Sequence, residues 1–596
     1  MARSRYSQAF LDSVKDGFDD ANALGRIGRW LCRNTRIKGR PFSFKDHEFQ
    51  EAIVDSLHHN QCTMKPSQCG LTEVENRKVL AFLNIEFDAK ALILLPTVAK
   101  AQKMMKSRMD LVIAESPVLD SALSVGGDSA SFKQFGRSQL FLAGTFGQAT
   151  ISDDIDFLFI DEYDFCNQEN LATANSRLQH SRFQDPLTGE RGIVHAACTP
   201  TVAGYGIDLL FSTSDQRRYL AKCPHCGTWF APSYLEHVRI PSFHDPLETL
   251  TWRKVQALDE GGFVDKAFLR CPVPRCSQRL TAHDLRPENR EWVAAYPSRT
   301  HQEGWAVSPL DLPKYHTPPT ILRKLLKYKS RVNHYYNFVL GLPYSDANNS
   351  VLDAVVEANC VLSPIPPDLA GPLGVAYTVM GLDVGLTSHL LVAVPDPSTG
   401  RLDVIWAERI SIPAADACDT LRATVLERVR QFNCRLLVAD HRPYAPTMNA
   451  IRAALPAGWM YPNNYELSDR HPLDYTIDAA SQTIKSNRTA VMNETARYCN
   501  AGLARFLAHA VETPILRQQL QGTKRIDEED EHGNLKSQWV KTGPHGDHYY
   551  HALGMVIMAS KMLDTAVTAQ VSAVPSIRSA LIGSRYTPQP DTVPTW

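Results

Sequence analysis

The stretch Phe157-Leu158-Phe159-Ile160-Asp161-Glu162 decides the fold of the first half of the chain. Four consecutive apolar residues are typical of a strand buried in a parallel sheet, and the two acids mark the carboxyl end of that strand. Three further apolar runs, which end at Thr97, Thr145 and Thr199, alternate with helical or polar stretches around it. This alternation predicts an α/β domain built on a parallel sheet with helices on its faces.

A candidate phosphate-binding loop precedes these strands, after an amphipathic helix and before a helical stretch. It reads Lys65-Pro66-Ser67-Gln68-Cys69-Gly70-Leu71-Thr72. Relative to the pattern GxxxxGK[ST], Gly70 and Thr72 retain the close-approach glycine and the hydroxyl that binds Mg²⁺, whereas Leu71 replaces the lysine. We expect Lys65 to reach the β- and γ-phosphates from the start of the loop. By itself the segment also fits a plain turn.

The order of the motifs favours an ATPase. After the loop come a strand with Pro96-Thr97, the acidic strand end, and the segment 195–201, HAACTPT, on another strand. In this layout Asp161 holds Mg²⁺ and Glu162 polarises the attacking water. The HAACTPT segment is then placed to sense the loss of the γ-phosphate and couple it to motion. The layout is typical of helicase-like and translocase ATPases.

A proline-rich stretch separates the two halves of the chain. Residues 362–372, LSPIPPDLAGP, are typical of a stiff linker. Beyond it lie β-like runs at 375–384, 390–395 and 402–408, then a helix, a strand at 435–440 and a later helix that begins near His551. The second half is therefore expected to be a separate domain.

Three aspartates in the second half suggest a nuclease. Asp383 lies within an apolar strand, Asp440 ends another strand, and Asp547 starts a helix. A carboxylate buried in an apolar strand is costly unless a cation offsets it. In a ribonuclease-H-like domain, acids in this order converge on two metal ions about 4 Å apart. Each aspartate alone also has a structural reading, and Asp547 in particular could cap its helix.

Two cysteine pairs lie in residues 222–293, where short segments with Pro, Cys and Trp replace the alternating apolar runs. They are Cys223-Pro-His-Cys226 and Cys271-Pro-Val-Pro-Arg-Cys276. Four thiolates in two short turns are the ligands of a closed, tetrahedral zinc site, so we expect a zinc-ribbon-like insert that has no open position for chemistry. The alternative is four reduced thiols.

Composition narrows the classes of protein. The 63 Lys and Arg nearly cancel the 64 Asp and Glu, so net charge gives no sign of nucleic acid and any DNA contact must come from local patches. The basic run 323–331 is the best such patch, with a solvated helix face as the alternative. No apolar run approaches the roughly 20 residues of a membrane-spanning helix, and the amphipathic N-terminus is unlike a secretory signal.

With these residues in view, the chain resembles the large terminase subunit of tailed double-stranded DNA phages, especially the lambda-like branch. The resemblance spans roughly residues 40 to 562 and rests on the motifs KPSQCGLTE, FLFIDEYD, CTPT and YNFVLGLPY. It implies that Lys65, Gln68, Gly70 and Thr72 form a variant phosphate loop. It also implies that Asp161 binds Mg²⁺, that Glu162 is the catalytic carboxylate, and that Asp383, Asp440 and Asp547 hold the nuclease metals, Mg²⁺ or Mn²⁺.

The resemblance further implies double-stranded DNA, the small terminase subunit and the portal of the procapsid as partners. It also implies a homo-oligomeric ring during packaging, no membrane association and a place in the cytoplasm of the infected bacterial host. The expected domains are an N-terminal partner-binding segment at 1–40, a P-loop ATPase at 41–361 with the insert at 222–293, a linker at 362–374, a ribonuclease-H-like endonuclease at 375–565 and a flexible tail at 566–596.

Two other functions are compatible with the same motifs. The first is a DNA helicase or repair translocase with an attached nuclease, which needs a second RecA-like domain, whereas the region from Thr201 to Val361 contains the cysteine segment instead. The second is a DNA-binding scaffold whose ATP and nuclease motifs are both degenerate. Intact acids at every proposed catalytic position argue against the scaffold.

Overall fold

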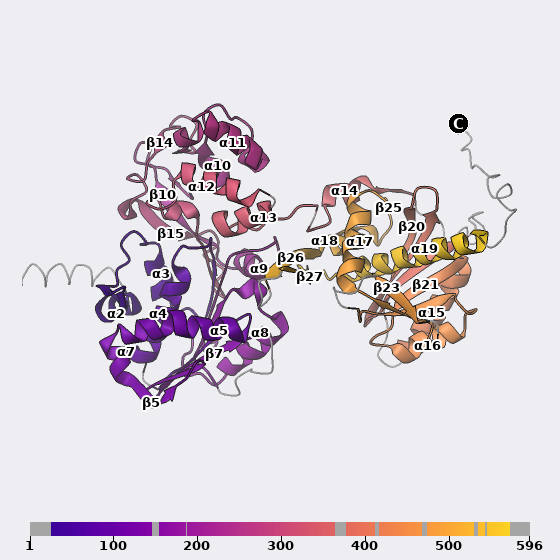
Figure 1. Ribbon diagram of the computed structural model, residues 1–596, viewed down its shortest axis with the longest axis horizontal. Coiled ribbons are helices and arrows are strands. Elements are labelled where there is room, and N and C mark those ends of the chain that lie inside the picture. The colour runs from indigo at the N-terminus through magenta and orange to yellow at the C-terminus, as the bar shows by residue number, and fades with distance from the viewer. Residues whose placement is uncertain are drawn as a thin grey trace, which may run out of the picture. The chain divides into compact units, whose positions relative to one another are not determined.

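A computed structural model describes residues 25–86, 88–145, 154–185, 188–329, 331–347, 349–363, 377–411, 417–467, 474–478, 480–529, 535–542 and 545–572 (Figure 1). The chain divides into two compact units: unit 1 comprises Met1–Ser345 with Asp527–Lys536, and unit 2 comprises Asp346–Ile526 with Ser537–Trp596. The boundary at Ser345 precedes the one expected after Val361, because β17 (Cys360–Leu362) pairs with a strand of unit 2. Most of the expected linker, partner-binding segment and tail lies outside the described residues.

Unit 1 is built on an eleven-stranded sheet whose middle is parallel, as the alternating pattern predicted. Its parallel strands, in spatial order, are β10 (Arg217–Lys222), β16 (Glu303–Ala306), β3 (Asn60–Met64), β9 (Ile193–Cys198), β8 (Phe157–Asp161), β4 (Lys90–Leu95) and β7 (Ser138–Gly144). Antiparallel strands complete the edges: β11 (Trp229–Phe230), β15 (Arg290–Ala294), β6 (Phe132–Phe135) and β5 (Leu123–Asp128).

Helices cover both faces of this sheet. One face packs against α4 (Leu71–Ile85), α5 (Val98–Met104), α6 (Asp110–Ala114) and α7 (Pro117–Ala122), and the other against α8 (Gln168–Asn175) and α9 (Gly206–Thr213). Along β8, Phe157 and Phe159 face α4, whereas Leu158 and Ile160 face α8. Because side chains alternate along a strand, Asp161 lies on the side of α4.

The phosphate-loop candidate directly follows β3. The strand β3 itself was not predicted from the sequence. The sequence of β3 is Asn60-Gln-Cys-Thr-Met64, and its polar residues conceal a strand that is buried from Gln61 onward. The elements that precede β3 in the chain are α2 (Arg26–Asn34), the hairpin of β1 (Arg36–Ile37) and β2 (Arg40–Pro41), and α3 (Gln50–Asp55). Strand, loop and helix thus follow in the order that a phosphate-binding loop needs.

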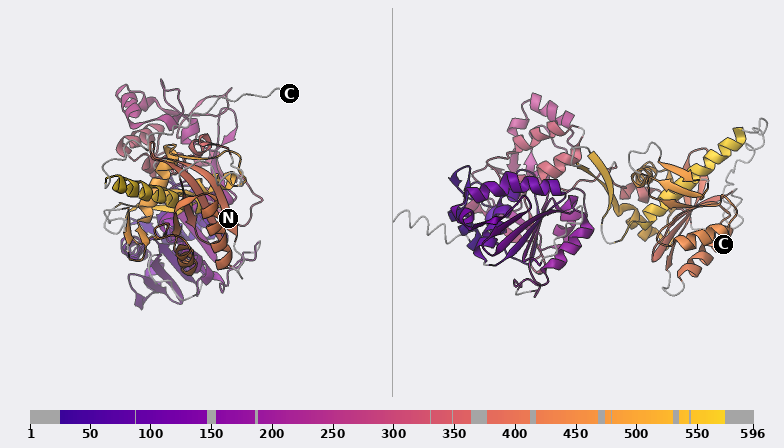
Figure 2. Two further views of the ribbon diagram at one scale, coloured as in Figure 1. Left: turned by 90° about the vertical axis from the view of Figure 1, so that its right-hand side faces the viewer. Right: turned by 60° about the horizontal axis from the view of Figure 1, so that its bottom comes forward.

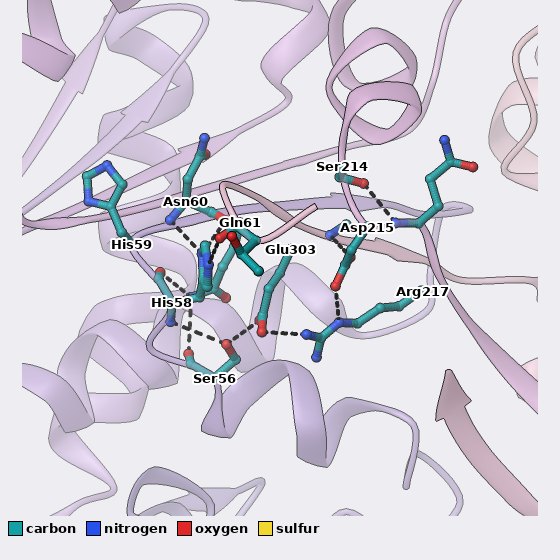
Figure 3. Close-up of polar contacts among 12 residues, drawn as sticks. Ser56, His58, His59, Asn60, Gln61, Ser214, Asp215, Arg217 and Glu303 are labelled. Atoms are coloured by element: carbon teal, nitrogen blue, oxygen red, sulfur yellow. Dashed lines mark hydrogen bonds and ion pairs between the residues drawn. The ribbon is translucent and has the colours of Figure 1, made fainter. Parts of the chain in front are cut away.

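A polar network ties the strands together at their amino ends (Figure 3). Arg217 donates to Asp215 at 2.7 Å and to Glu303 at 2.6 Å, and Glu303 also accepts from Ser56 at 2.5 Å. Gln61 donates to the backbone oxygens of Ser56 and His58. These polar groups supply each other's hydrogen bonds, so we assign this end of the sheet a structural role.

The cysteine segment forms a small subdomain with its own core. It contains α10 (Tyr234–His237), α11 (Trp252–Glu260) and the three-stranded sheet of β12 (Val238–Arg239), β13 (Phe268–Arg270) and β14 (Arg279–Leu280). The following helix α12 (Pro318–Lys324) and the π-helical turn Tyr335–Leu340 pack into the same core. Between them lies the short helix α13 (Val332–His334).

Unit 2 is built on a nine-stranded mixed sheet. Its order is β17, β25 (Ala504–Leu507), β20 (Arg401–Ser411), β19 (Thr387–Asp396), β18 (Thr378–Asp383), β21 (Cys434–Asp440), β22 (Met460–Asn464), β24 (Thr483–Ser486) and β23 (Tyr475–Asp478). The first three strands in chain order after β17 form an antiparallel meander, and β21 and β22 then add parallel to the other side of β18. β26 (Thr523–Glu529) and β27 (Leu535–Lys541) form a separate two-stranded sheet.

Two helical layers cover the sheet of unit 2. One face packs against α15 (Ala417–Gln431) and α16 (Ala445–Ala453). The other packs against α17 (Arg488–Asn500), α18 (Thr513–Gln521) and the long α19 (His548–Ser572), yellow in the figures (Figure 1, Figure 2), while α14 (Asp353–Ala358) packs against α17 and α18. α19 lies so close to β18 that a Cβ on Gly381 would meet the Ala552 carbonyl oxygen at 2.1 Å. Within the described residues, no helix is long and apolar enough to span a bilayer.

Candidate functional site

The loop from Lys65 to Gly70 joins the end of β3 to the start of α4. Gln68 and Gly70 adopt left-handed conformations, with φ of 61° and 79°, and Gly70 is the N-cap residue of α4. The N-terminus of a 15-residue helix presents free backbone N–H groups and the positive end of its dipole, which favour a phosphate. The variant loop therefore has the local structure of an anion-binding turn.

Thr72 and Asp161 meet beside this loop. The Thr72 hydroxyl donates to the Asp161 carboxylate at 3.4 Å, and Asp161 is almost fully buried. Burial raises the pKa of Asp161 above its ordinary value, and the positive charge of Lys65 only partly opposes this. Burial acts to lower the pKa of Lys65, but the combined attraction of Asp161 and weaker neighbouring groups more than offsets it. A hydroxyl and a carboxylate at this separation are oxygen ligands of the kind Mg²⁺ takes next to a nucleotide.

Glu162 lies one residue beyond the end of β8. Its backbone is left-handed, with φ of 56°, and its carboxylate accepts from Lys100 of α5 at 2.6 Å. Both side chains are about two-fifths exposed, 42% for Glu162 and 40% for Lys100, so water reaches the carboxylate. The sequence did not single out Lys100, whose only signal was its place just after Pro96-Thr97.

Asp164 connects this acidic turn to the HAACTPT segment. Its carboxylate accepts from the backbone N–H and the hydroxyl of Thr201, at 3.0 and 2.7 Å, and from Ile207 N–H at 2.7 Å. Burial raises the pKa of Asp164 to about 6, against the opposing effect of these hydrogen bonds. The Thr201 carbonyl in turn accepts from the Asn337 side chain at 2.7 Å. A continuous set of hydrogen bonds thus links the acidic turn to the YNFVLGLPY stretch.

That stretch packs directly on the phosphate loop. The Ser67 N–H donates to the Phe338 carbonyl at 2.8 Å, and Gly341, with φ of 67°, comes so close that a Cβ there would lie 2.8 Å from Pro66 N. The backbone of the loop is therefore held from outside by a segment far along the chain.

A cavity of about 660 Å³ opens beside the loop, within the usual size range of a small-ligand site. Its lining includes Lys65, Gln68, Thr72, Asp161, Glu162, Lys100, Lys103, Arg108, Arg331 and His334. The end of the basic run thus faces this cavity, whereas Arg323, at its start, is paired with Asp259 and Asp265 at 2.8 and 2.7 Å. The predicted contact of this run with DNA phosphate stays a prediction.

In unit 2, Asp383 and Asp440 end neighbouring parallel strands. Leu382 pairs with Ala439, so the two aspartates follow side by side. Val379 and Val438 of these strands face α19, and alternation places both acids on that same face. Burial, together with the charge of Asp383, raises the pKa of Asp440 to about 7. Such mutual repulsion is relieved by a cation.

Asp547 immediately precedes α19, at the end of the helix that covers these acids. Burial acts to raise the pKa of Asp547, but a hydrogen bond and the charge of His551 hold it below its ordinary value. His551 lies 3.4 Å from Asp547, and its other nitrogen is 3.2 Å from the Tyr465 hydroxyl. Burial raises the pKa of the Tyr465 hydroxyl, and the charges of Asp440, Asp383 and Asp547 add to that effect.

Two histidines at this site were missed by the sequence reasoning. His548 Nδ1 lies 2.8 Å from the Asp383 carboxylate, and His389 stacks on His548 with ring centres 4.6 Å apart. Asp383, His389 and His548 carry ligand atoms that all lie within 4.8 Å of one another. His548 is adjacent to Asp547 in sequence, which was an available signal. His389 is brought in only by the register of β18 and β19, in which it pairs with Asp383.

The four cysteines of the insert gather into one cluster. Cys223 and Cys276 Sγ atoms are 3.8 Å apart, and those of Cys226 and Cys271 are 3.7 Å apart. All four sulfur atoms lie within 4.8 Å of one another. Four thiolates around one zinc at about 2.3 Å are separated by about 3.8 Å along each tetrahedral edge, so the donor set fits that ion.

Unit 1 therefore has an α/β fold in which the loop between β3 and α4 lies beside Asp161 and a cavity. Residues 39–292 match the family model described as phage terminase large subunit gpA, ATPase domain. No curated protein gives a match.

The solved structures that the chain matches include three terminases. The HK97 bacteriophage large terminase is 10% identical, with 89% of this chain and 98% of that chain covered and a TM-score of 0.49. The Thermus phage P74-26 large terminase ATPase domain is 12% identical, with 51% and 98% covered and a TM-score of 0.28. The human cytomegalovirus terminase nuclease domain, Mn soaked and inhibitor bound, is 9% identical, with 37% and 97% covered and a TM-score of 0.22.

Proposed function

We propose that this chain is a DNA-packaging motor and endonuclease: unit 1 hydrolyses ATP to move double-stranded DNA into the procapsid, and unit 2 cuts concatemeric DNA. The observation that carries the proposal is that one chain holds two separate sites of different chemistry. Thr72 and Asp161 meet at a phosphate loop in unit 1, and Asp383 and Asp440 end adjacent strands in unit 2.

In the ATP site, the loop from Lys65 to Thr72 holds the phosphates, with Lys65 in place of the missing lysine at position 71. Thr72 and Asp161 would hold Mg²⁺, which neutralises charge on the β- and γ-phosphates when bound. Glu162 orients and polarises the attacking water. Because Lys100 pairs with Glu162, the carboxylate is kept on the solvent side of the strand end, where water is available. When the γ-phosphate is lost, Asp164 and Thr201 transmit the resulting movement of the turn after β8 to the YNFVLGLPY segment, through Asn337.

For unit 2 we propose a ribonuclease-H-like endonuclease. An antiparallel meander of three strands, extended by two parallel strands on the far side of the first, supports that finer assignment. Asp383, Asp440 and Asp547 would hold two Mg²⁺ or Mn²⁺ ions, which supply an activated water and stabilise the leaving oxygen when bound. The aspartates bind and orient those ions, and α19 shields one side of the site.

For the cysteine cluster we propose one structural zinc ion in a zinc-ribbon-like insert. The sulfur separations of 3.7 and 3.8 Å support a tetrahedral site, and all four positions are taken by protein thiolates. The site would therefore stabilise the insert and leave no position for substrate.

The finer biological setting is also a proposal. We infer membership of the lambda-like branch from the lysine at the start of KPSQCGLTE. The expected partners are double-stranded DNA, the small terminase subunit and the portal, with a homo-oligomeric ring during packaging in the cytoplasm of the infected bacterial host. The partner-binding segment predicted at 1–40 belongs to the same proposal.

The test is a pair of activities measured on the full chain. Thr72→Val should abolish DNA-stimulated ATP turnover and leave metal-dependent DNA cleavage intact, whereas Asp440→Asn should do the reverse. A variant that loses both activities while remaining folded would contradict two separate sites. Unwinding of duplex DNA by the wild-type chain would favour a helicase with an attached nuclease, and absence of both activities would favour a scaffold.

A further inference from the structure

Resting on the nuclease assignment above, we infer that His548 is a metal ligand beside Asp383, so that the site mixes nitrogen and oxygen ligands and selects a transition-metal ion such as Mn²⁺ over Mg²⁺. The distance carries the first step. His548 Nδ1 and the nearer Asp383 oxygen are 2.8 Å apart, close to the separation of about 3 Å between adjacent ligands of an octahedral ion bound at about 2.1 Å.

The surroundings of His389 decide which histidine can bind. Gln519 accepts from the Tyr549 N–H through its oxygen at 2.8 Å, which turns its amide nitrogen toward His389 Nε2 at 3.2 Å. An amide nitrogen only donates, so His389 Nε2 accepts and its lone pair is used. His389 Nδ1 then carries the proton and donates to the Thr387 carbonyl at 3.2 Å. Both nitrogens of His389 are thereby committed within the protein.

His389 instead positions the ring of His548. The two rings are nearly parallel, at 13°, and the buried ring of His389 is fixed from its other side by Tyr549 in edge contact at 4.8 Å. His548 itself is the partly open member of the pair, with 41% of its side chain exposed, while Asp383 is only 9% exposed. An ion entering from solvent therefore meets the imidazole of His548 and the carboxylate of Asp383 together.

The choice of ion follows from the ligand chemistry. Mg²⁺ binds through oxygen and keeps much of its water shell, whereas imidazole is a common ligand of transition-metal ions. A site of aspartates alone would accept Mg²⁺ and Mn²⁺ with little preference. Adding His548 as a ligand strengthens the binding of Mn²⁺ but changes the affinity for Mg²⁺ very little.

The experiment titrates Mn²⁺ and Mg²⁺ into the full chain without nucleotide, by electron paramagnetic resonance for Mn²⁺ and by competition for Mg²⁺. His548→Ala should weaken Mn²⁺ binding at least about tenfold, in line with the cost of disturbing a metal ligand, and change Mg²⁺ binding much less. Spin-echo modulation from a directly bound ¹⁴N should be present in the wild type and absent in His548→Ala.

Two matched variants test the assignment within the histidines. His389→Phe keeps an aromatic ring against His548 but has no ligand atom, so it should retain the ¹⁴N signal. His545→Ala removes an exposed histidine outside the ligand cluster and should behave as the wild type. Unchanged Mn²⁺ affinity with a persistent ¹⁴N signal in His548→Ala, or loss of that signal in His389→Phe alone, would overturn the inference.

A different result would show that the proposed nuclease metal site itself is wrong. Asp383→Asn should weaken both ions, because it removes a shared carboxylate. If neither ion binds the wild type, or if Asp383→Asn leaves both affinities unchanged, the metal site itself is wrong. If Asp383→Asn weakens both ions and His548→Ala weakens neither, the site stands and the role of His548 is wrong.

Discussion

At the scale of single residues, Glu162 is the side chain on which ATP hydrolysis should depend most. Glu162→Gln keeps the shape but removes the charge that polarises water, so turnover should fall by about 10² to 10⁴. ATP binding should persist, since the loop and Asp161 are unchanged. Steady-state turnover and equilibrium binding of labelled ATP separate these effects. Glu190→Gln, whose partner is His59 at 2.8 Å outside the cavity, is the matched control, and wild-type turnover in Glu162→Gln would refute the role.

Asp164 should make the stability of unit 1 depend on pH. Its carboxyl ionises near 3.8 in the unfolded chain and near 6 when folded, so between these values only the unfolded chain has released the proton. The stability that Asp164 contributes below pH 3.8 is therefore lost as the pH rises through 6. The loss amounts to roughly 3 kcal/mol, at about 1.36 kcal/mol for each pH unit over which the states differ in protonation.

Urea unfolding of the wild type and Asp164→Asn across this pH range measures the effect. The variant carries no titrating group there, so the stability advantage of the wild type over the variant should shrink from pH 4 to pH 7. Asp88→Asn, at an exposed acid paired with Arg137, should show no such trend. An advantage that grows with pH would mean that hydrogen bonds from Thr201 and Ile207, rather than burial, dominate at Asp164.

The same scale shows what sequence could and could not predict about the sites. Thr72 and Asp161 were recognisable because their residue types and order are fixed by phosphate and Mg²⁺ chemistry. His389 was not recognisable, because its place beside Asp383 depends on the register of two strands and its orientation on Gln519. Lys100 gave a weak signal for a similar reason, since an exposed lysine on a helix usually has no specific partner.

At the scale of elements, the YNFVLGLPY segment should control the shape of the phosphate loop. Gly341→Ala places a Cβ 2.8 Å from Pro66 N, so either the segment or the loop must move. ATP affinity should fall measurably, while circular dichroism should show an intact fold. Gly136→Ala is the control, because its φ of 60° imposes similar strain in open space. Equal effects of the two substitutions would mean that backbone strain, rather than contact with the loop, is responsible.

The cysteine cluster is a second prediction at this scale. One zinc ion per chain should be found by elemental analysis of protein purified without chelator, and Cys226→Ser should lose it. Because the binding energy of a structural site is also folding energy, the insert should then become sensitive to proteolysis while the parallel sheet remains protected. Cys418→Ser, at an exposed thiol in unit 2, is the control. If the full-length protein contains no zinc, the four cysteines are reduced thiols and not metal ligands.

Elements also show where sequence patterns succeed. β4, β7, β8 and β9 were predicted because most of their residues are buried and apolar. β3 was missed because its sequence, NQCTM, places polar side chains in contacts that only the folded sheet provides: Gln61 is bonded to Lys78 and Thr63 to His195. In unit 2, strands β22 to β25 are only four or five residues long, and their pattern was too weak to predict.

At the scale of the whole molecule, the two units should respond to different ligands. Scanning calorimetry should show one transition that rises with nucleotide and another that rises with Mn²⁺, because each ligand stabilises only the unit that binds it. The gain is about 2.7 kcal/mol for a ligand at 100 times its dissociation constant. Asp383→Asn should abolish the Mn²⁺ effect and keep the nucleotide effect. A single transition that both ligands raise together would show that the units unfold as one.

Gly381 carries a consequence for how this chain can change over generations. Its Cβ position is occupied by the backbone of α19, so even the smallest substitution must push that helix off the sheet. The helix begins directly after Asp547, and any such displacement would move that acid away from Asp383 and Asp440. Descendants of this chain that still cut DNA should therefore have inherited glycine at this position, although it contacts neither metal nor substrate. Sequence drift around it should be freer at Met380 and Leu382, whose side chains lie in the apolar cluster on the other face of the sheet.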